Sequence, residues 1–461
     1  MPSQIPDFYV LALVAALMIL FSIVAAAMRK VRAQFAIAVI FMLILIARLV
    51  IMLIASDNYS ALNLFSANPF SLFVSLLFTV GVLLVNILAY AKDASYSNFS
   101  LLSVFALMGM YMVAMSTSLV SIFIGLELMS IPTIFAMLLS KRVAIEASVK
   151  LFILASVAIA LFSFGMVMVF GSSGSVALSG NVTTGLLALG ALAVLIAALA
   201  FDSALFPFNL WVPDVYQGAN TYITALIGGI NKKVGFIALM QVLFLLFVAY
   251  KTTFVPIIYA LAILTMFYGN LAALAQKNVK RMLAYSSIAH AGYISIGIAV
   301  ATAYALGAAL FQIAAHMIMF IGALAIVLFM ESRNRHEIND YIGLHKENGF
   351  ASFSLAIILL GLIGTPLTIG FIGKFLLFSS AVYANMLPLA IIGIINSIIS
   401  VYYYFRVVSA MYSEKSGVSQ MKMHRNVAFV VLACVLLTIV LGVYPNLLLG
   451  LANAAGTYLV G

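Results

Sequence analysis

The stretch FDSALFPFNLWVPDVYQGAN, residues 201–220, decides how this chain folds. It closes a long apolar run and places Asp202 five residues before Pro207 and twelve before Asp214. A proline inside a helix breaks it, because the ring removes a backbone donor and clashes with the preceding turn. A helix broken at membrane depth must satisfy its freed backbone groups from neighbours or water. The stretch therefore predicts an interrupted helix beside a polar cavity.

The composition indicates a membrane protein. The 461 residues are 66% hydrophobic and only 7% charged, against about 25% charged in a soluble domain. Apolar windows long enough to cross a bilayer recur from end to end, which predicts a polytopic membrane protein. The opening span lacks a basic flank and is longer than a signal-peptide core, so we expect a retained helix. The single Cys, Cys434, excludes an internal disulfide and a cysteine-ligated cluster.

The apolar runs predict an all-α fold of about fourteen transmembrane helices. The expected spans are 8–28, 34–55, 68–90, 100–117, 118–140, 146–171, 185–213, 222–250, 255–276, 282–301, 303–330, 350–378, 387–410 and 427–448.

Two of these spans are interrupted: the seventh at LFPFNLWVP and the twelfth at GTPLTIGFIGKF, residues 364–375. They lie five helices apart and cross in opposite directions, as in an inverted-topology repeat with discontinuous helices. We therefore predict three N-terminal helices over 1–99, a five-helix repeat over 100–250, its inverted counterpart over 251–410, and a C-terminal helix over 411–461.

The loop charges predict an orientation. Basic residues follow the first, fifth, ninth, eleventh and thirteenth spans, and the opposite face carries little beyond Lys251. By the positive-inside rule the basic face is cytoplasmic and both termini are external. No basic run exceeds three residues, so the net charge of +10 indicates a lipid bilayer as partner, with no nucleic acid. The residues behind this expectation are Arg29, Lys30, Arg32, Lys141, Arg142, Lys277, Lys280, Arg281, Arg333, Arg335, Lys346, Lys415, Lys422 and Arg425.

Four charged residues fall deep inside predicted spans: Glu127, Asp202, Lys232 and Lys374. Each costs about 2.5–3.5 kcal/mol to insert, so the series costs on the order of 10 kcal/mol. Burial favours the neutral form of a carboxyl or an amine, which lets such groups hold or release a proton near neutral pH. The series therefore predicts a proton relay. Fixed ion pairs remain the alternative for any one pair, since paired buried charges are common.

Other polar positions carry weaker signals. Lys150 is shallower, near the cytoplasmic side, and His316 lies in the eleventh span. His290 in the tenth span is predicted to be a hydrogen-bonded packing residue. The aromatic run YYYF at 402–405 is predicted to serve packing at the membrane interface.

Six motifs resemble one family. In chain order they are LELMSIPTIFAM (126–137), AIEASVKLFILAS (144–156), FPFNLWVPDVYQGA (206–219), QKNVKRMLAYSSIAHAGY (276–293), GTPLTIGFIGKF (364–375) and SIISVYYYFRVV (397–408). They resemble the antiporter-like membrane subunits of respiratory complex I, and most closely subunit N of prokaryotic NADH–quinone oxidoreductase. The resemblance runs from about residue 100 to 410.

The resemblance implies roles for matching residues. Glu127 stands at the glutamate of the fifth helix, Lys150 at the lysine that opens the sixth, and Lys232 at the central relay lysine of the eighth. Lys374 stands at the terminal lysine of the twelfth helix. His316 falls where subunit N usually has Tyr and related subunits have His.

Asp202 departs from the family pattern. It occupies the position of the principal buried lysine in the broken seventh helix, and Asn209 replaces the histidine that usually follows PF. The sign of the central charge is therefore inverted, so Glu127 faces a second carboxylate unless a lysine moves in. An acid at this position can still carry a proton.

The resemblance implies a proton-translocating membrane subunit in the cell membrane of a prokaryote, enzymatic only within its assembly. Protons are expected to enter near Lys150, pass Asp202 and Lys232, and leave near Lys374. The redox cofactors would lie on other subunits, with none on this chain, and the donor would be NADH or ferredoxin. The alternatives are an Mrp-type cation/proton antiporter subunit and a scaffold subunit with an inactive channel.

Overall fold

The structure is a computed structural model that describes residues 7–28, 30–55, 59–61, 64–90, 96–138, 143–179, 182, 185–414 and 419–460. Eleven helical segments within these ranges are long and apolar enough to cross a membrane, and several shorter apolar helices accompany them. The chain divides into two compact units. Unit 1 comprises 1–203, 230–254 and 454–461, and unit 2 comprises 204–229 and 255–453.

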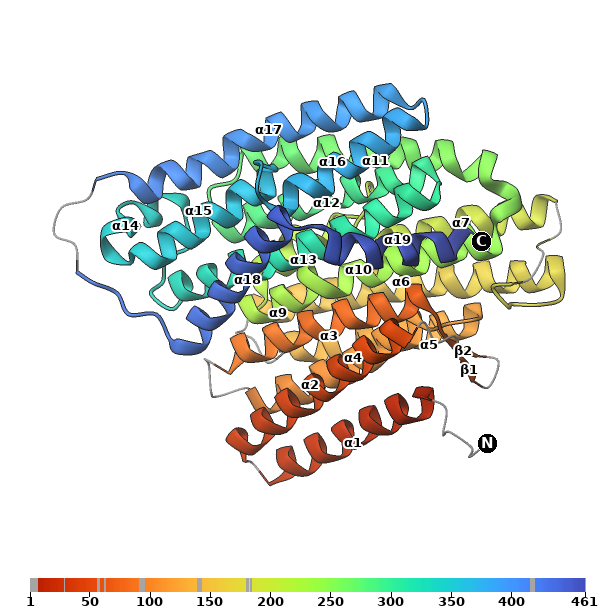
Figure 1. Ribbon diagram of the computed structural model, residues 1–461, viewed down its shortest axis with the longest axis horizontal. Helices are drawn as coiled ribbons and strands as arrows, with labels where there is room; N and C mark the ends of the chain where they lie inside the picture. The colour runs from red at the N-terminus through yellow and green to blue at the C-terminus, as the bar shows by residue number, and fades with distance from the viewer. Residues whose placement is uncertain are drawn as a thin grey trace. The chain divides into compact units, whose positions relative to one another are not determined.

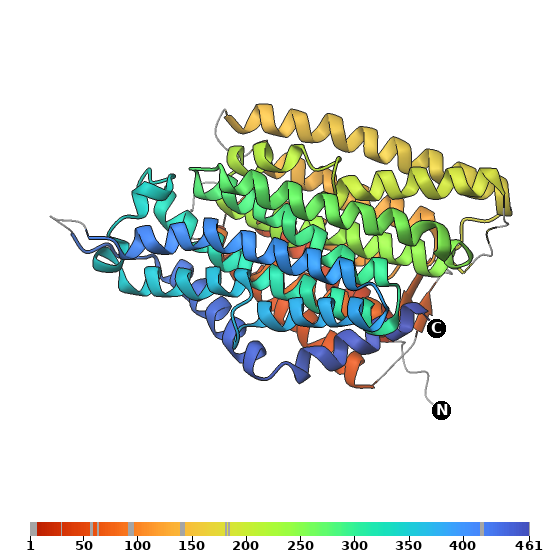
Figure 2. The same ribbon diagram turned by 90° about the horizontal axis from the view of Figure 1, so that it is seen from above.

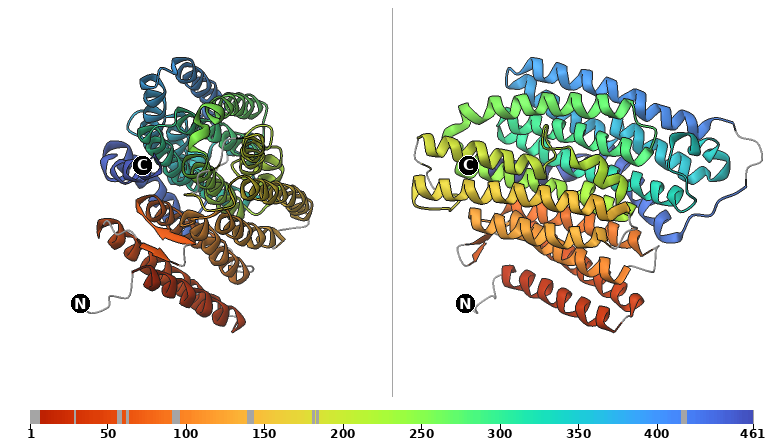
Figure 3. Two further views of the ribbon diagram at one scale, coloured as in Figure 1. Left: turned by 90° about the vertical axis from the view of Figure 1, so that its right-hand side faces the viewer. Right: turned by 180° about the vertical axis from the view of Figure 1, so that it is seen from behind.

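Unit 1 is a bundle of successive helices that pack on their sequence neighbours (Figure 1). Its elements are α1 (Asp7–Ala27), α2 (Val31–Ala55), β1 (Tyr59–Ala61), β2 (Phe65–Ala67), α3 (Pro69–Ala89), α4 (Tyr96–Ala114), α5 (Leu119–Leu138), α6 (Val143–Ser173), α7 (Leu186–Asp202), α10 (Lys232–Gln241), the π-helix η3 (Val242–Leu246) and the 3₁₀ turn η4 (Val248–Tyr250). The strands β1 and β2 form one antiparallel hairpin (Figure 3).

Unit 2 begins with the second half of the seventh predicted span. Its elements are α8 (Trp211–Gly218), α9 (Thr221–Leu226), α12 (Val279–Val300), α13 (Ala303–Glu331), the 3₁₀ turn η5 (Ile338–Tyr341), α14 (Leu344–Glu347), α15 (Gly349–Ile363), α16 (Ile369–Tyr383), α17 (Leu387–Tyr412) and α18 (Arg425–Val443). Three elements cross the division of the chain: the π-helix η2 (Ile227–Asn231), α11 (Lys251–Leu274) and α19 (Asn446–Val460).

The core of unit 2 is α13, in which every residue from Ala305 to Met330 is buried. It packs against α12, α16 and α18. Figure 2 shows α17 running alongside the two shorter helices α15 and α16. The outer helices keep large exposed apolar faces, as expected for helices whose solvent is lipid.

The helix starts follow local sequence signals. In α3, Pro69 opens the helix and Asn68 caps it, with a reciprocal pair of 2.9 Å bonds between Asn68 and Ser71. Four helices of unit 2 begin with an Asn or Thr side chain that accepts a backbone N–H three residues on: Asn278, Thr302, Asn348 and Thr368.

The prediction of an all-α membrane protein interrupted in its seventh and twelfth spans is confirmed. The seventh span stops at Asp202 and resumes at Trp211, and the twelfth stops at Ile363 and resumes at Ile369. The predicted last span, 427–448, is wrong at its end. The helix stops at Val443, and α19 follows after Pro445 because a proline cannot continue the helix.

Candidate functional site

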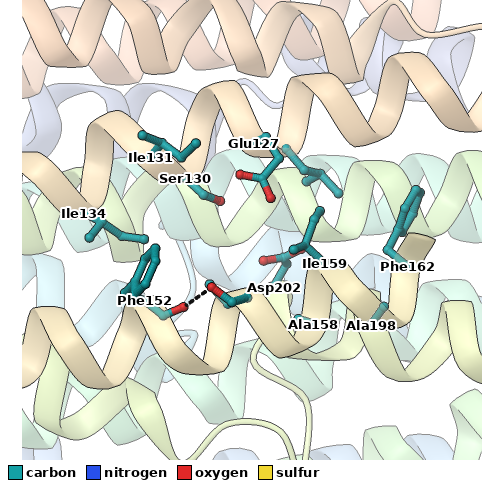
Figure 4. Close-up of a pocket in the computed structure, with 13 residues that line it drawn as sticks. Glu127, Ser130, Ile131, Ile134, Phe152, Ala158, Ile159, Phe162, Ala198 and Asp202 are labelled. Atoms are coloured by element: carbon teal, nitrogen blue, oxygen red, sulfur yellow. Dashed lines mark hydrogen bonds between the residues drawn. The ribbon is translucent and has the colours of Figure 1, made fainter. Parts of the chain in front are cut away.

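The first candidate site lies in unit 1, where two carboxylates face one cavity. Glu127 belongs to α5 and Asp202 ends α7. Both line a cavity of about 40 Å³ together with the hydroxyl-bearing Ser130 and Ser156. Figure 4 shows Glu127 and Asp202 facing the same space. A water needs about 10–15 Å³ of such volume and two to four polar partners, so this cavity suits ordered water beside both acids.

A glycine positions Asp202. A Cβ on Gly235 would lie 2.8 Å from the Asp202 Cβ and 2.7 Å from the Ser203 nitrogen, so only glycine lets α10 approach the end of α7 this closely. Small residues serve this purpose generally where membrane helices touch. Because Lys232 lies three residues before Gly235, nearly one helical turn away, α10 carries it on the side that meets α7.

Lys232 and Lys233 are both buried, with exposed fractions of 1% and 0%. The preceding residue, Asn231, donates a 2.7 Å hydrogen bond to the Thr133 hydroxyl of α5, the helix that carries Glu127. Its amide oxygen is buried without a hydrogen-bond partner among the residues described. Such an atom indicates a place for water. A π-helix, η2, leads into this lysine pair, and π-bulges are frequent at functional sites.

Lys150 lies elsewhere. It pairs with Glu146 one turn earlier on α6 at 3.0 Å, and their side chains are 49% and 78% exposed. Other residues of α6, among them Phe152 and Ser156, line the carboxylate cavity, with the Ser156 hydroxyl donating to the Phe152 carbonyl at 2.8 Å. The structure thus brings Glu127 and Asp202 together and leaves Lys150 outside the residues that line their cavity.

The second candidate site lies in unit 2 at the break of the twelfth span. The Lys374 ammonium, on α16, donates to the carbonyls of Leu362 at 3.0 Å and Ile363 at 2.7 Å, and to the Ser397 hydroxyl at 3.0 Å. These carbonyls belong to the last turn of α15, which has no intrahelical donors for them. Gly364, with φ of 97°, turns the chain there. The break and the buried lysine therefore stabilise each other.

Aromatic and imidazole rings connect Lys374 to α12 and α13. The ammonium lies 4.7 Å from the centre of the Tyr293 ring. The Tyr293 and His290 ring centres are 5.5 Å apart, and those of His290 and His316 are 4.6 Å apart. His316 and Lys374, predicted separately from sequence, are thus joined by two residues that were not predicted to take part in transfer.

His290 has a polar partner as predicted, because Gln312 lies 3.2 Å from its Nδ1. Its place between His316 and Tyr293 gives it a position in the series beyond packing. A histidine in an apolar span one turn from a tyrosine was the available sequence signal.

The aromatic run at 402–405 divides by face. Tyr402 and Phe405 are exposed, as predicted for an interface, whereas Tyr403 and Tyr404 are buried. The Tyr403 hydroxyl donates to Asn270 at 3.0 Å, and Asn270 donates to Asn396 at 3.1 Å. The Tyr404 hydroxyl bonds Ser286. Tyr403 and Tyr404 therefore pack in the interior and also form hydrogen bonds, because a helix turns consecutive residues toward different surroundings.

The motif WVPDVYQGA holds α8 to α12. Arg281 donates to Asp214 and Gln217, both at 2.9 Å. Lys280 donates to the Ala219 carbonyl at 2.6 Å and pairs with Glu331 at 3.3 Å. Asn209, in the break before α8, is fully buried, and its amide atoms have no hydrogen-bond partner among the described residues. The motif therefore fixes α8 against α12, next to the interruption that holds the polar side chain of Asn209.

The fold and these two sites define a class: a multi-pass membrane protein with interrupted helices, half-buried acids, and buried lysines and histidines. Such residues inside a membrane mark ion or proton pathways. The model of the family described as NADH:quinone oxidoreductase/Mrp antiporter, TM, matches residues 116–400, and the chain belongs to this family.

Individual relatives agree with the family match. NADH-quinone oxidoreductase subunit N of Trichlorobacter lovleyi is 36% identical over 368 residues, covering 76% of this chain and 75% of the relative. F(420)H(2) dehydrogenase subunit N of Methanosarcina mazei is 34% identical over 418 residues, covering 86% and 85%. A chain of respiratory complex I from Thermus thermophilus superposes with a TM-score of 0.82 at 27% identity, covering 95% of this chain and 98% of that chain. The resemblance read from the motifs is confirmed.

Proposed function

We propose that this chain is a proton-translocating membrane subunit of a complex I-like oxidoreductase, which couples electron transfer to quinone in other subunits to proton movement here. The relatives named as subunits N of an NADH-quinone oxidoreductase and of an F(420)H(2) dehydrogenase support this function. Its partners are other membrane subunits, as for the similar chain in respiratory complex I. We assign no redox cofactor to this chain, and its one cysteine could not ligate an iron–sulfur cluster.

The observation that carries the proposal is the burial of lysines inside membrane-spanning segments. Lys232, Lys233 and Lys374 have exposed fractions of 4% or less in a chain with only 7% charged residues. Burying a lysine lowers the stability of the fold, and a protein that translocates protons uses the buried lysine to bind a proton reversibly. In each unit the lysine lies on a helix that also contacts an interrupted segment.

The side chains of the two units suggest different steps in proton transfer. In unit 1, Asp202 and Glu127 exchange protons with water in their shared cavity, and Lys232 takes part beside them. Both carboxylates occupy one small cavity, so charging one disfavours charging the other. In unit 2, His316, His290 and Tyr293 connect to Lys374, which releases the proton. Lys150, paired with Glu146 on an exposed helix face, remains the proposed entry.

We further propose that both termini are external and that the basic loops face the cytoplasm. The described basic residues Lys280, Arg281, Arg333 and Arg335 lie at the ends of α12 and α13 or just beyond. Arg29, Lys141, Arg142 and Lys415, which also support this orientation, lie outside the described residues. A cysteine-labelling experiment on membrane vesicles tests it: a cysteine placed at Lys346 should react only from the cytoplasmic side.

The second candidate function is an Mrp-type antiporter subunit, because the family description includes those proteins. Purification of the tagged chain from membranes separates the two. Quinone-site and iron–sulfur subunits should copurify, and adding donor and quinone to the reconstituted complex should drive proton uptake. Copurification with antiporter subunits alone, or uptake that needs a sodium gradient and ignores quinone, would establish the second function instead. A monodisperse monomer would contradict both.

A further inference from the structure

Besides the carboxylate cavity of unit 1, a polar cavity lies in unit 2, and none of the proposed proton-transfer residues lines it. Its volume is about 460 Å³, and it is bounded by the turn after α11, the 3₁₀ turn η5 and the last turns of α17. The polar residues that line it are Lys277, Glu337, Asn339, Arg406, Ser409 and Ser413. The proton-transfer side chains are absent from this lining, so the cavity needs its own explanation.

The backbone holds the cavity wall in place. The Ile338 N–H donates to the Lys277 carbonyl at 2.9 Å, and the Val279 N–H donates to the His336 carbonyl at 3.0 Å. These bonds join the turn that carries Lys277 to the segment that leads into η5. The wall that presents the lysine is therefore fixed by paired backbone, in contrast to a loose surface loop.

Arg406 is fixed as well. Its guanidinium donates to the carbonyl of Leu274 at 3.2 Å and also bonds the carbonyl of Gln276, at the end of α11. A guanidinium has five N–H donors in a rigid fork, so donors remain for a ligand. The bonded carbonyls carry no net charge, and the positive charge of Arg406 is not neutralised by them.

Lys277 adds a second positive charge. Within the part of the chain that the structure describes, no ion pair includes Lys277. The one acid of the lining, Glu337, precedes η5: its backbone carbonyl accepts the Asp340 N–H at 3.0 Å, and its backbone N–H donates to the Asp340 carboxylate at 2.8 Å. The lining therefore combines two cations, one carboxylate, two hydroxyls and one amide, and its excess of positive charge suits a phosphate ester better than a metal or a cationic ligand.

An apolar stripe on α17 leads into this cavity. Ile391, Ile395, Ile398, Tyr402 and Phe405 are exposed at intervals of three or four residues, and Ser409 continues the same face at the cavity. The fourteen residue-to-residue steps from Ile391 to Phe405 rise about 21 Å at 1.5 Å per step. Half of a hydrocarbon core is about 15 Å, so the stripe is long enough for the acyl chains of one leaflet.

We propose that the cavity binds the phosphate headgroup of an anionic phospholipid whose acyl chains lie along the exposed face of α17. Lys277 and Arg406 contact the phosphate, and Ser409 donates a hydrogen bond to its ester or glycerol oxygens. The Ser413 hydroxyl, which donates to the Ser409 carbonyl at 2.8 Å, borders the site. Basic pockets among membrane helices are a known way of recognising such headgroups. Free phosphate shares the headgroup chemistry but makes no use of the apolar stripe, and this distinction is what the experiment exploits.

The test is native mass spectrometry of the whole purified complex, depleted of lipid and titrated with phosphatidylglycerol or phosphatidylcholine. We compare wild type with Lys277→Gln, Lys277→Arg and the control Lys422→Gln, which removes an exposed lysine outside this cavity. Lys277→Gln should weaken the tightest phosphatidylglycerol binding about fivefold, as expected for one lysine near anionic lipid. Lys277→Arg and Lys422→Gln should retain it. Ser409→Leu, which fills the cavity mouth while leaving both cations, should also weaken it.

Several outcomes overturn the proposal. Equal binding of phosphatidylcholine would show that the headgroup charge is not recognised. Displacement by millimolar inorganic phosphate would show an anion site without a lipid. An unchanged Lys277→Gln variant that also folds and assembles normally would remove the lysine from the site. Protection of Lys277 from amine labelling by another subunit, after lipid removal, would assign the cavity to a protein partner.

Discussion

The Lys374 ammonium donates a 2.7 Å hydrogen bond to the carbonyl of Ile363, the last residue of α15. The lysine on the second half of the twelfth span thus closes the end of the first half. A buried cation and an interrupted helix are each costly in a membrane. Here each satisfies the other, so proton release from Lys374 should alter the bonding of the break itself. We therefore expect the break to take part in transfer as well as in shape.

Replacing Lys374 by Met should abolish proton uptake and weaken the structure modestly. The Leu362 carbonyl loses its donor, which costs about 1–3 kcal/mol for a buried unsatisfied group. Ser397 still donates to Ile363 at 3.0 Å, so folding should survive. Proton uptake in reconstituted vesicles, at equal amounts of assembled subunit, is the measurement. The Ser397→Ala variant is the control and should keep most of the uptake; wild-type uptake in Lys374→Met would remove the lysine from the path.

Asp202→Asn should lower proton translocation strongly while keeping the amount of assembled subunit near that of wild type. The amide keeps the shape and hydrogen bonding of the side chain but cannot exchange a proton. Glu414→Gln, a neutralised acid whose side chain is 94% exposed, serves as control. An Asn variant that pumps like wild type would show that Asp202 is outside the path and would favour a scaffold role for this half.

Asp202→Lys restores the family residue and should recover only part of the activity. Glu127 and the surrounding cavity are arranged around a carboxylate, and Gly235 leaves little room beside the Asp202 backbone. The measurement is proton uptake per electron transferred to quinone, compared across Asp, Asn and Lys at position 202. Full activity of the Lys variant would show that the cavity accepts either sign of charge without adaptation.

Gly235→Ala should destabilise unit 1 by about 1–3 kcal/mol, because the added methyl overlaps the end of α7 and no flexible side chain can yield. The matched control is Gly450→Ala, a helical glycine whose Cβ would meet nothing within 4 Å. Thermal inactivation of the purified complex reports the difference. Equal midpoints for the two variants would contradict the close approach between α10 and α7.

Glu331→Gln should be among the most damaging single changes in unit 2. It leaves Lys280, whose side chain is 5% exposed, without its charged partner, and breaking a buried pair from one side costs about 3–5 kcal/mol. The double variant Lys280→Met with Glu331→Leu should be less damaging, since it buries no unpaired charge. Subunit abundance and thermal inactivation are the measurements. A double variant worse than Glu331→Gln would assign the pair a role beyond stability.

The chain by itself determined the features that depend on local sequence. A long apolar segment is more stable in lipid than in water whatever its neighbours are, so the apolar runs were enough to predict the membrane spans. Prolines and Gly364 interrupt helices by local sterics, so both breaks were predictable. The cost of a charge in hydrocarbon is also local, and it singled out Asp202, Lys232 and Lys374 before any neighbour was known.

Tertiary structure alone decided which of these groups meet. Glu127 and Asp202 share a cavity because α5, α6 and α7 pack around it, while Lys150 turns to an exposed face by its position on α6. Tyr293 and Tyr403 entered the site through contacts between helices far apart in the chain. Hydropathy and spacing describe one helix at a time, whereas proton transfer depends on distances between helices, and packing sets those distances.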